Sequence, residues 1–193
     1  MVSRLEKVLR KRFPDEDVFL LADLLLEASL KGMISYEEIN FEEKTEELLL
    51  LAYRQRMLIP FRTSQVSKSL AWDNRILIFQ PQESYEMPLI IRYLVKNAEK
   101  TGRWSPFKAL KECLTDLGEK KIKQTLKVTR KILRKAKKEN YKIVAEQISK
   151  FAVEAGVNPS ELIGKLEGLG VISPCSRKFL TRGVVYEVNP SMF

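Results

Sequence analysis

Apolar residues in the first part of the chain recur every three or four positions, the spacing that places them on one face of a helix. Pro14 and Gly32 interrupt this pattern, because proline disfavours helix in the preceding residue and glycine commonly follows a helix end. Ser35 and Glu38 have the spacing of a capping box, which predicts a brief helix after a short extended segment. The pattern therefore predicts helices over residues 3–13, from 15 to 32, from Ser35, and over 43–57.

Two apolar, β-prone runs follow, at Leu58–Arg62 and Arg75–Phe79, and a polar loop separates them. Such an arrangement is typical of a β-hairpin. The order of helices followed by a hairpin defines a first unit of the chain, which we expect to end near Pro81.

The middle of the chain is predicted to form two amphipathic helices, one over residues 88–100 and one from Ser105 to Leu117. Gly102 and Gly118 follow these segments and are expected to end them. The two helices either link the ends of the chain or begin a bundle that a later helix completes, and the pattern does not separate these alternatives.

After residue 118, five positions at steps of four, three, four and three predict one strongly amphipathic helix, namely Ile122, Leu126, Thr129, Leu133 and Ala136. Asn140 is expected to end it. A helix over 142–155 and a shorter one over 160–169 follow, and Val171–Ser173 is predicted to be extended. Residues 183–188 alternate in the manner of a strand.

Charge changes the interpretation of this last region. Residues 119–150 contain 12 Lys or Arg and three Glu, so their net charge equals the +9 of the whole 193-residue chain. Most of these cations fall on faces of the predicted helix away from its apolar stripe. A concentration of cations on one face is typical of polyanion binding, and a solvated surface helix is the alternative.

Composition excludes several classes of site. The chain has no histidine, which rules out Ser-His and Cys-His catalytic pairs and the commonest metal ligand. Its two cysteines are too few for a disulfide framework or a four-cysteine zinc site, and no glycine-rich phosphate loop is present. No apolar run is long enough to cross a membrane, and no secretion signal is found at the start. We therefore expect a cytoplasmic protein that is not an enzyme and uses no cofactor or metal.

The stretch SELIGKLEGLGVISP at residues 160–174 resembles the third helix and first wing strand of the winged helix-turn-helix superfamily, and GVVYEVNP at 183–190 resembles its return strand. Residues 15–80 resemble the same superfamily less closely. The resemblance implies a mostly α fold with small β-hairpins (α+β), in which tandem winged-helix-like units are joined by a helical middle section. The expected domains are 1–80, a linker over 81–118, and 119–193, which the basic helix leads.

In this superfamily the third helix usually enters the major groove of DNA and the wing contacts the adjacent backbone. The resemblance therefore implies that Ser160, Glu161, Lys165 and Glu167 form the exposed face of a reading helix. Arg177, Lys178 and Arg182 would lie on the wing. The corresponding helix of the first unit begins with glutamates at 42, 43, 46 and 47. We expect that unit to bind protein, including a second copy of itself, rather than DNA.

These observations predict a transcriptional regulator that binds double-stranded DNA mainly through its phosphates. RNA is an alternative ligand, and a winged-helix protein adaptor without direct DNA binding is an alternative function. The expected nucleic-acid-binding residues are Lys120, Lys123, Lys127, Arg130, Arg134, Lys137, Lys138, Ser160, Lys165, Arg177, Lys178 and Arg182.

Overall fold

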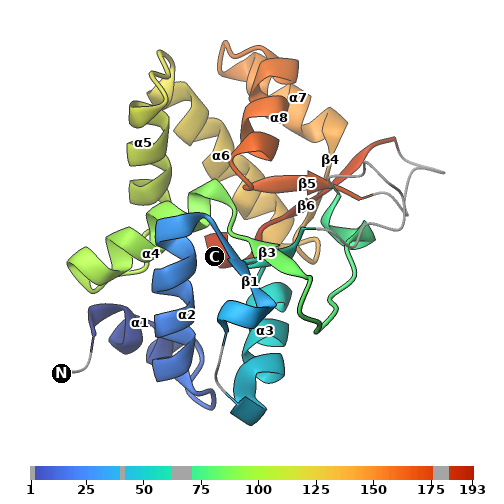
Figure 1. Cartoon of the computed structure of the whole chain (residues 1–193). Helices are drawn as coiled ribbons and strands as arrows, with labels where there is room; N and C mark the ends of the chain where they lie inside the picture. Colours follow the sequence, from blue (N-terminus) through green and yellow to red (C-terminus); the bar gives the residue numbers. More distant parts are fainter. Residues whose placement is uncertain (1–2, 40–41, 62–70, 176–182) are drawn as a thin grey trace.

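The computed structural model describes residues 3–39, 42–61, 71–175 and 183–193, and Figure 1 shows the arrangement of their helices and strands. The helices are α1 (Arg4–Arg12), α2 (Val18–Lys31), α3 (Thr45–Arg54), α4 (Leu89–Thr101), α5 (Pro106–Asp116), α6 (Ile122–Lys137), α7 (Ala145–Glu154) and α8 (Pro159–Gly168). The strands are β1 (Met33–Ser35), β2 (Ile59–Pro60), β3 (Ser84–Glu86), β4 (Lys142–Val144), β5 (Ile172–Pro174) and β6 (Val185–Val188). The protein is thus mostly helical with small antiparallel sheets, which confirms the predicted α+β class.

Local signals in the sequence explain where several helices begin and end. The side chains of Ser3 and Asp17 accept hydrogen bonds from the first turns of α1 and α2, and Asn158 does the same for α8. Gly32 ends α2 in the left-handed conformation, with a φ of 83°. The capping box of Ser35 and Glu38 is present and begins a short 3-10 helix.

The described strands form two small sheets with the same order. In the first the order is β1-β3-β2, and in the second it is β4-β6-β5, with antiparallel pairing throughout. Each sheet also has the same relation to the chain: a helix precedes its first strand, further helices follow it, and the last two strands complete the sheet. The two halves of the protein therefore share one topology.

Two predicted elements are wrong. The return strand of the first sheet is Ser84–Glu86, not Arg75–Phe79. Residues 84–86 alternate polar and apolar, and the central Tyr85 is fully buried, whereas the continuous apolar run from Arg75 leaves Ile76 exposed. The predicted helix over 142–155 begins instead with strand β4, a three-residue segment too short for its period to be separated from the helical pattern after it.

The sequence left open whether the two middle helices link the ends of the chain or pack with a later helix. They do both. Helix α4 packs on α1 and α2, and α5 packs between α4 and α6. Strand β3 joins the first sheet although it lies beyond residue 80, where the first unit was expected to end. Buried apolar residues from both halves belong to one continuous core. The described parts of the two halves consequently form one packed body.

Polar contacts also join the two halves, at a junction that we name the seam. Asn189 donates from Nδ2 to the carbonyl oxygens of Arg56 and Gly170, at 3.1 Å each. The Arg56 guanidinium pairs with the carboxylate of Glu187, with 3.0 Å between Nε and Oε1. The hydroxyl of Ser191 donates to the carbonyl of Gln55 at 2.7 Å. The turn between α3 and β2 is thus held by the C-terminal segment, which fixes how the halves are oriented.

We expect Glu187→Gln to lower the free energy of unfolding by roughly 2 kcal/mol. The side chains of Arg56 and Glu187 are only 14% and 16% exposed, so the substitution leaves a largely desolvated cation without an acid. Glu27→Gln is the control, since Glu27 and Lys31 are each nearly half exposed and such pairs contribute at most about 1 kcal/mol. Urea denaturation measures both variants, and an equal loss in the two would show that the seam pair has no special role.

Candidate nucleic-acid interface

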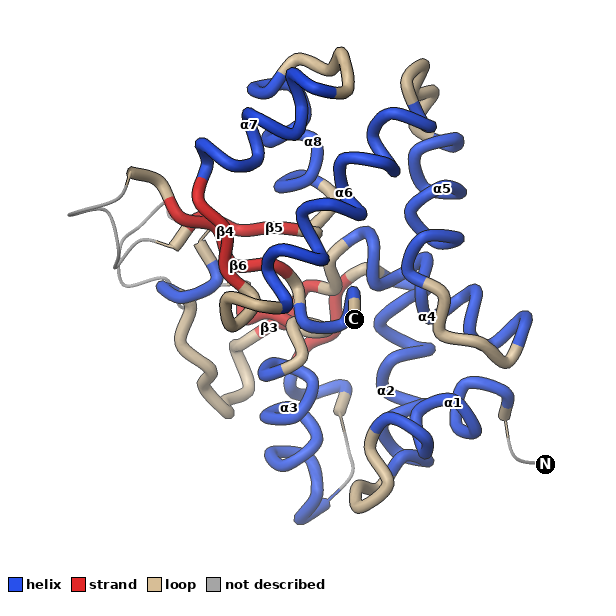
Figure 2. Tube along the Cα trace, turned by 180° about the vertical axis from the view of Figure 1, so that it is seen from behind, coloured by secondary structure: helices blue, strands red, loops and turns tan. Residues whose placement is uncertain are grey.

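Helix α6 is the element that organises the candidate interface. Its inner face carries Thr125, Val128, Thr129, Ile132, Leu133 and Ala136, all buried. In Figure 2, which views the protein from behind, α6 lies between α5 and α7, and its last turns lie near the C-terminus of the chain. Beyond its last residue, Asn140 and Tyr141 have positive φ angles of 50° and 60°, so the chain turns there and enters β4. The predicted amphipathic helix and its end near Asn140 are confirmed.

Five cations form a line along the outer face of α6. Their steps of four, three, four and three residues keep them on one face over about 21 Å at 1.5 Å per residue. All five are exposed, and within the described residues none makes an ion pair. We name this line the basic stripe: Lys123, Lys127, Arg130, Arg134 and Lys137.

Acids flank the basic stripe without neutralising it. Lys131 pairs with Glu154 at 2.6 Å, and Lys135 pairs with Glu139 at the same distance. The hydrogen bond from Lys131 lowers the pKa of Glu154, so this acid is ionised at neutral pH. Both paired lysines lie beside the stripe rather than on it, so neither Glu154 nor Glu139 forms an ion pair with a stripe cation among the described residues.

The other predicted residues differ in their surroundings. Lys120 and Lys138 are exposed just beyond the two ends of α6, and Ser160 is exposed on α8. Lys165 on α8 contacts the carboxylate of Glu119, so its charge is already neutralised. Arg177, Lys178 and Arg182 lie outside the described residues. The structure therefore brings the α6 cations together on one face, whereas Lys165 on α8 is paired with Glu119 and Ser160 lies on α8 rather than α6.

The third helix of each half presents little positive charge. On α8, Ser160, Glu161, Gly164 and Gly168 are exposed. On α3 and the turn before it, Glu43, Glu46 and Glu47 are exposed. Burial raises the pKa of Glu167, which lies on the less accessible side of α8. Neither helix has the chemistry expected of a surface that approaches phosphates closely.

Two hollows lie at the end of the basic stripe that is nearer the seam. The first, of about 310 Å³, is lined by Arg130, Arg134 and Lys137 of α6 and by Phe107, Met192 and Phe193. We name it the aromatic hollow. The second, of about 650 Å³, is the polar hollow, and Lys137 and Phe193 line both.

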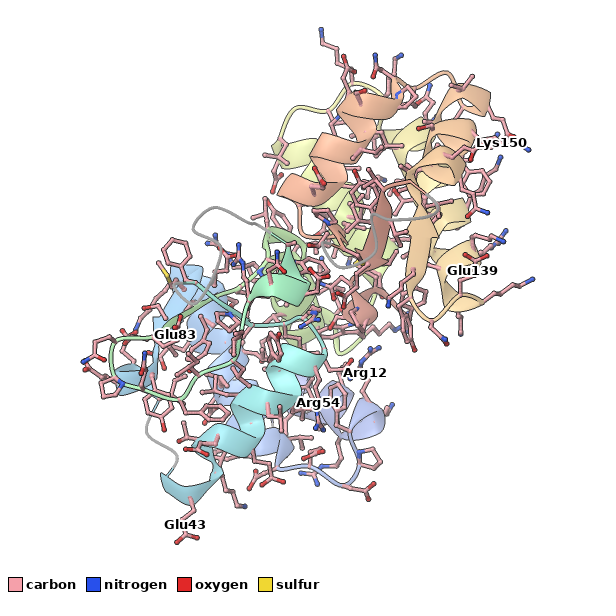
Figure 3. All side chains as sticks on the ribbon, turned by 90° about the vertical axis from the view of Figure 1, so that its right-hand side faces the viewer. Arg12, Glu43, Arg54, Glu83, Glu139 and Lys150 are labelled. Carbon is pink, nitrogen blue, oxygen red and sulfur yellow. The ribbon has the colours of Figure 1, made fainter. Side chains whose placement is uncertain are left out.

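The polar hollow includes two arginines that the sequence analysis did not select, Arg12 of α1 and Arg54 of α3. Figure 3 shows both at the junction of the two halves. They were missed because they lie far from residue 119 in the sequence and only tertiary packing brings them to α6. The three basic residues that end α1 were the one available signal.

Comparison with protein-family models shows which family the protein belongs to. A protein-family model matches residues 3–193. The chain belongs to this uncharacterised family. No match was found among curated proteins or among solved structures. The family match includes both sheets, α6 and the seam, so the arrangement described above lies entirely within the region shared with the family.

The described residues do not favour a metal site, a membrane span or a reactive cysteine. Within residues 3–39, 42–61, 71–175 and 183–193, acidic and cysteine side chains form no cluster that could hold a metal ion. None of the helices in the same ranges is both long and apolar enough to cross a membrane. Cys113 is buried, and its burial raises the pKa of its thiol to about 11, so it is not a reactive thiolate at neutral pH.

Proposed function

We propose that both halves of the protein are winged-helix units. The order of elements supports this proposal. In the first half the order is α2, β1, the 3-10 helix at Tyr36–Glu38, α3, β2 and β3, and in the second it is α6, β4, α7, α8, β5 and β6. The first and last strands of each unit are neighbours in the sheet, as winged-helix topology requires. On this assignment, α6 is the first helix of the second unit.

The protein is proposed to bind double-stranded DNA through the basic stripe, and to serve as a transcriptional regulator. The observation that carries the proposal is the line of five exposed cations, none of which forms an ion pair with another described residue. Each cation that contacts a phosphate releases condensed counterions, which favours binding. Phosphate contacts position a protein on the duplex without selecting a sequence. The neutral and acidic third helices are consistent with this division of roles.

We expect Lys127→Ala to weaken duplex binding roughly threefold to tenfold, because Lys127 is one of the five cations of the basic stripe and makes no ion pair among the described residues. The control is Lys131→Ala, which removes the same charge from the neighbouring position, where Glu154 already compensates it. Fluorescence anisotropy with a labelled duplex measures both. Equal weakening would mean that net charge alone matters and that the stripe is not the binding surface.

The second candidate function is a protein adaptor, and the exposed glutamates of the first unit favour it. Glu43, Glu46 and Glu47 give that unit an acidic surface suited to a basic protein partner. Failure to bind duplex DNA even at low salt would favour the adaptor. RNA is the alternative ligand of the stripe, and competition between duplex DNA and structured RNA for the labelled protein separates the two.

A further inference from the structure

Helix α2 is apolar on nearly every side, yet one of its faces is exposed. Polar residues occupy only four of its 14 positions, namely Asp23, Glu27, Ser29 and Lys31. The helix packs on α1 and α4 and buries apolar side chains against them. A helix that is hydrophobic all round is normally covered all round, and exposed apolar patches with a polar rim are typical of interaction surfaces.

The exposed side chains of α2 form one line along the helix. Phe19, Asp23, Leu26 and Leu30 follow each other at steps of four, three and four residues, which keeps them on one side over roughly 16 Å at 1.5 Å per residue. Phe19 is 55% exposed and Leu30 is 74% exposed, whereas Leu26 is partly buried. Met33, which begins β1 just beyond the helix, is 40% exposed. We name the line of four helix residues the α2 face.

The charges along the α2 face are acidic. Asp23 is exposed between two apolar residues of the face, and it makes no ion pair among the described residues. Lys31 is the one cation of the helix, and it is already paired with Glu27 and with Glu38, at 2.8 Å each. Residues 14–60 contain 11 Asp or Glu and four Lys or Arg, a net charge of −7. The first half therefore surrounds the α2 face with acids.

Cations on the neighbouring helices do not offset Asp23. Lys7 and Lys11 are exposed on α1, but α2 packs on α1 with its buried side, and Figures 1 and 3 show α1 behind α2. Arg92 of α4 reaches only the C-terminal end of α2, where its Nε donates to the carbonyl of Ser29 at 3.2 Å. The N-terminal part of the α2 face is consequently apolar and acidic.

The position of Asp23 decides which occupant fits. A partner that covers Phe19 and Leu26 also covers Asp23 between them, and burying a carboxylate without a cation is unfavourable. The partner must therefore place a Lys or Arg at that point. A second copy that pairs through the same face about a two-fold axis brings acid against acid. The basic stripe of a second copy supplies cations, but the apolar residues of its helix are buried. Phosphates of nucleic acids or lipids are repelled.

We propose that the α2 face docks a basic amphipathic helix of a partner protein. Such a helix would be about three turns long, with apolar residues between Phe19 and Leu30 and a cation against Asp23. Two helices of this kind pack by placing the ridges of one in the grooves of the other. The inference goes beyond duplex binding and does not rest on it, since no residue of the basic stripe belongs to the α2 face. It gives the adaptor alternative a specific surface and a class of partner.

Fluorescence anisotropy of labelled peptides with the full chain tests the chemistry of the partner. The probe is a peptide of about 15 residues whose leucines share one helical face and whose other positions are lysine. One control peptide has glutamate in place of lysine, and the other has the probe's composition in an order that scatters the leucines. We expect the probe to bind at least about tenfold more tightly than either control, because apolar contact and the pairing of Asp23 both contribute. Equal binding of either control peptide would refute the proposal.

Serine substitutions locate the binding surface. The double variant Phe19→Ser and Leu30→Ser should weaken probe binding at least about tenfold, because it removes the two most exposed apolar side chains of the α2 face. The matched control is Val153→Ser, since Val153 is 67% exposed on α7, outside the face. Probe binding that is unchanged in the double variant, or equally weakened in the control, would overturn the site.

A charge exchange tests the role of Asp23. Asp23→Lys should weaken binding of the lysine probe about tenfold and strengthen binding of the glutamate peptide about tenfold, and a loss of folding cannot produce that gain. Glu161→Lys makes the same change of net charge on α8, where Glu161 is exposed, and should leave the binding of both peptides unchanged. Equal effects of the two substitutions would show that net charge alone decides, and would refute docking at the α2 face.

Sedimentation of the full chain tests the remaining occupant, a second copy. We expect a monomer, or a dimer that Phe19→Ser with Leu30→Ser leaves intact. A dimer that this double variant dissociates would overturn the proposal, because the protein itself would then cover the α2 face. Lys127→Ala separates the two proposals, since it should weaken duplex binding without changing probe binding. Probe binding without duplex binding refutes only the DNA proposal, and the reverse result refutes only the docking site.

Discussion

Raising the monovalent salt concentration from 50 to 200 mM should weaken duplex binding about 500-fold. The logarithm of the affinity falls with the logarithm of the salt concentration with a slope of about −0.9 for each phosphate contacted. Contacts from all five cations of the basic stripe give a slope of about −4.5. Anisotropy titrations at four or five salt concentrations measure this slope directly, without knowledge of the preferred DNA sequence.

The double variant Lys123→Ala and Lys127→Ala should reduce the magnitude of the slope to about 2.7, because two of the phosphate contacts are lost. These residues are chosen because they lie on the stripe but line neither hollow. The matched control replaces Lys131 and Lys135, which are paired with Glu154 and Glu139. A slope that falls equally in the control, or one near zero in the wild type, would contradict duplex binding by α6.

For the proposed function, the seam determines the arrangement in which the two halves would meet a nucleic acid. Asn189 and Glu187 fasten the second half to the turn that contains Arg56, and the hydroxyl of Ser173 accepts a hydrogen bond from the backbone of Trp72 at 3.0 Å. Two fastened halves cannot reorient independently, so α6 and the cations of α1 and α3 keep one fixed geometry. A preorganised surface of this kind loses less conformational entropy on binding than one formed by flexibly linked domains.

The sequence predicted well those features that depend on local period and composition. Helix α6, its buried face and its exposed cations follow from spacing alone, and so do the ends of α2 and α4 at Gly32 and Gly102. The α+β class follows from the same patterns. The DNA-binding role of these cations stays a prediction, since charge and exposure are properties of the surface and binding is a property of a complex.

Features that depend on distant contacts could not be predicted. The pairing of Lys165 with Glu119 joins residues 46 positions apart, and nothing in either segment indicates the other. Arg12 and Arg54 reach the polar hollow only because the first half packs against the C-terminal segment. Strand β3 was missed because the more apolar run at Arg75–Phe79 predicts the return strand instead. Strand β4 was missed because three residues are too few to separate it from the helical pattern that follows.

Replacing Gly170 with alanine should lower the free energy of unfolding by about 3 kcal/mol and the melting temperature by roughly 6–12 °C. Gly170 has a φ of 73°, and an added Cβ would lie 2.4 Å from Cβ of Pro88 at the start of α4. The conformation disfavours any side chain by about 1 kcal/mol, and overpacking adds about 1–3 kcal/mol. The carbonyl oxygen of Gly170 also accepts a hydrogen bond from the Asn189 side chain, which is one of the contacts of the seam.

Gly118→Ala isolates the contribution of the contact with Pro88. Gly118 has a nearly identical φ of 70°, but an added Cβ there meets nothing within 4 Å. It should therefore cost only the conformational part, about 1 kcal/mol. The difference between the two variants in chemical denaturation measures how closely α4 and the second half must approach. Equal losses would show that Pro88 can move away from the added Cβ without loss of stability. The close packing between the halves would then contribute little to holding α6 and the N-terminal arginines in one orientation.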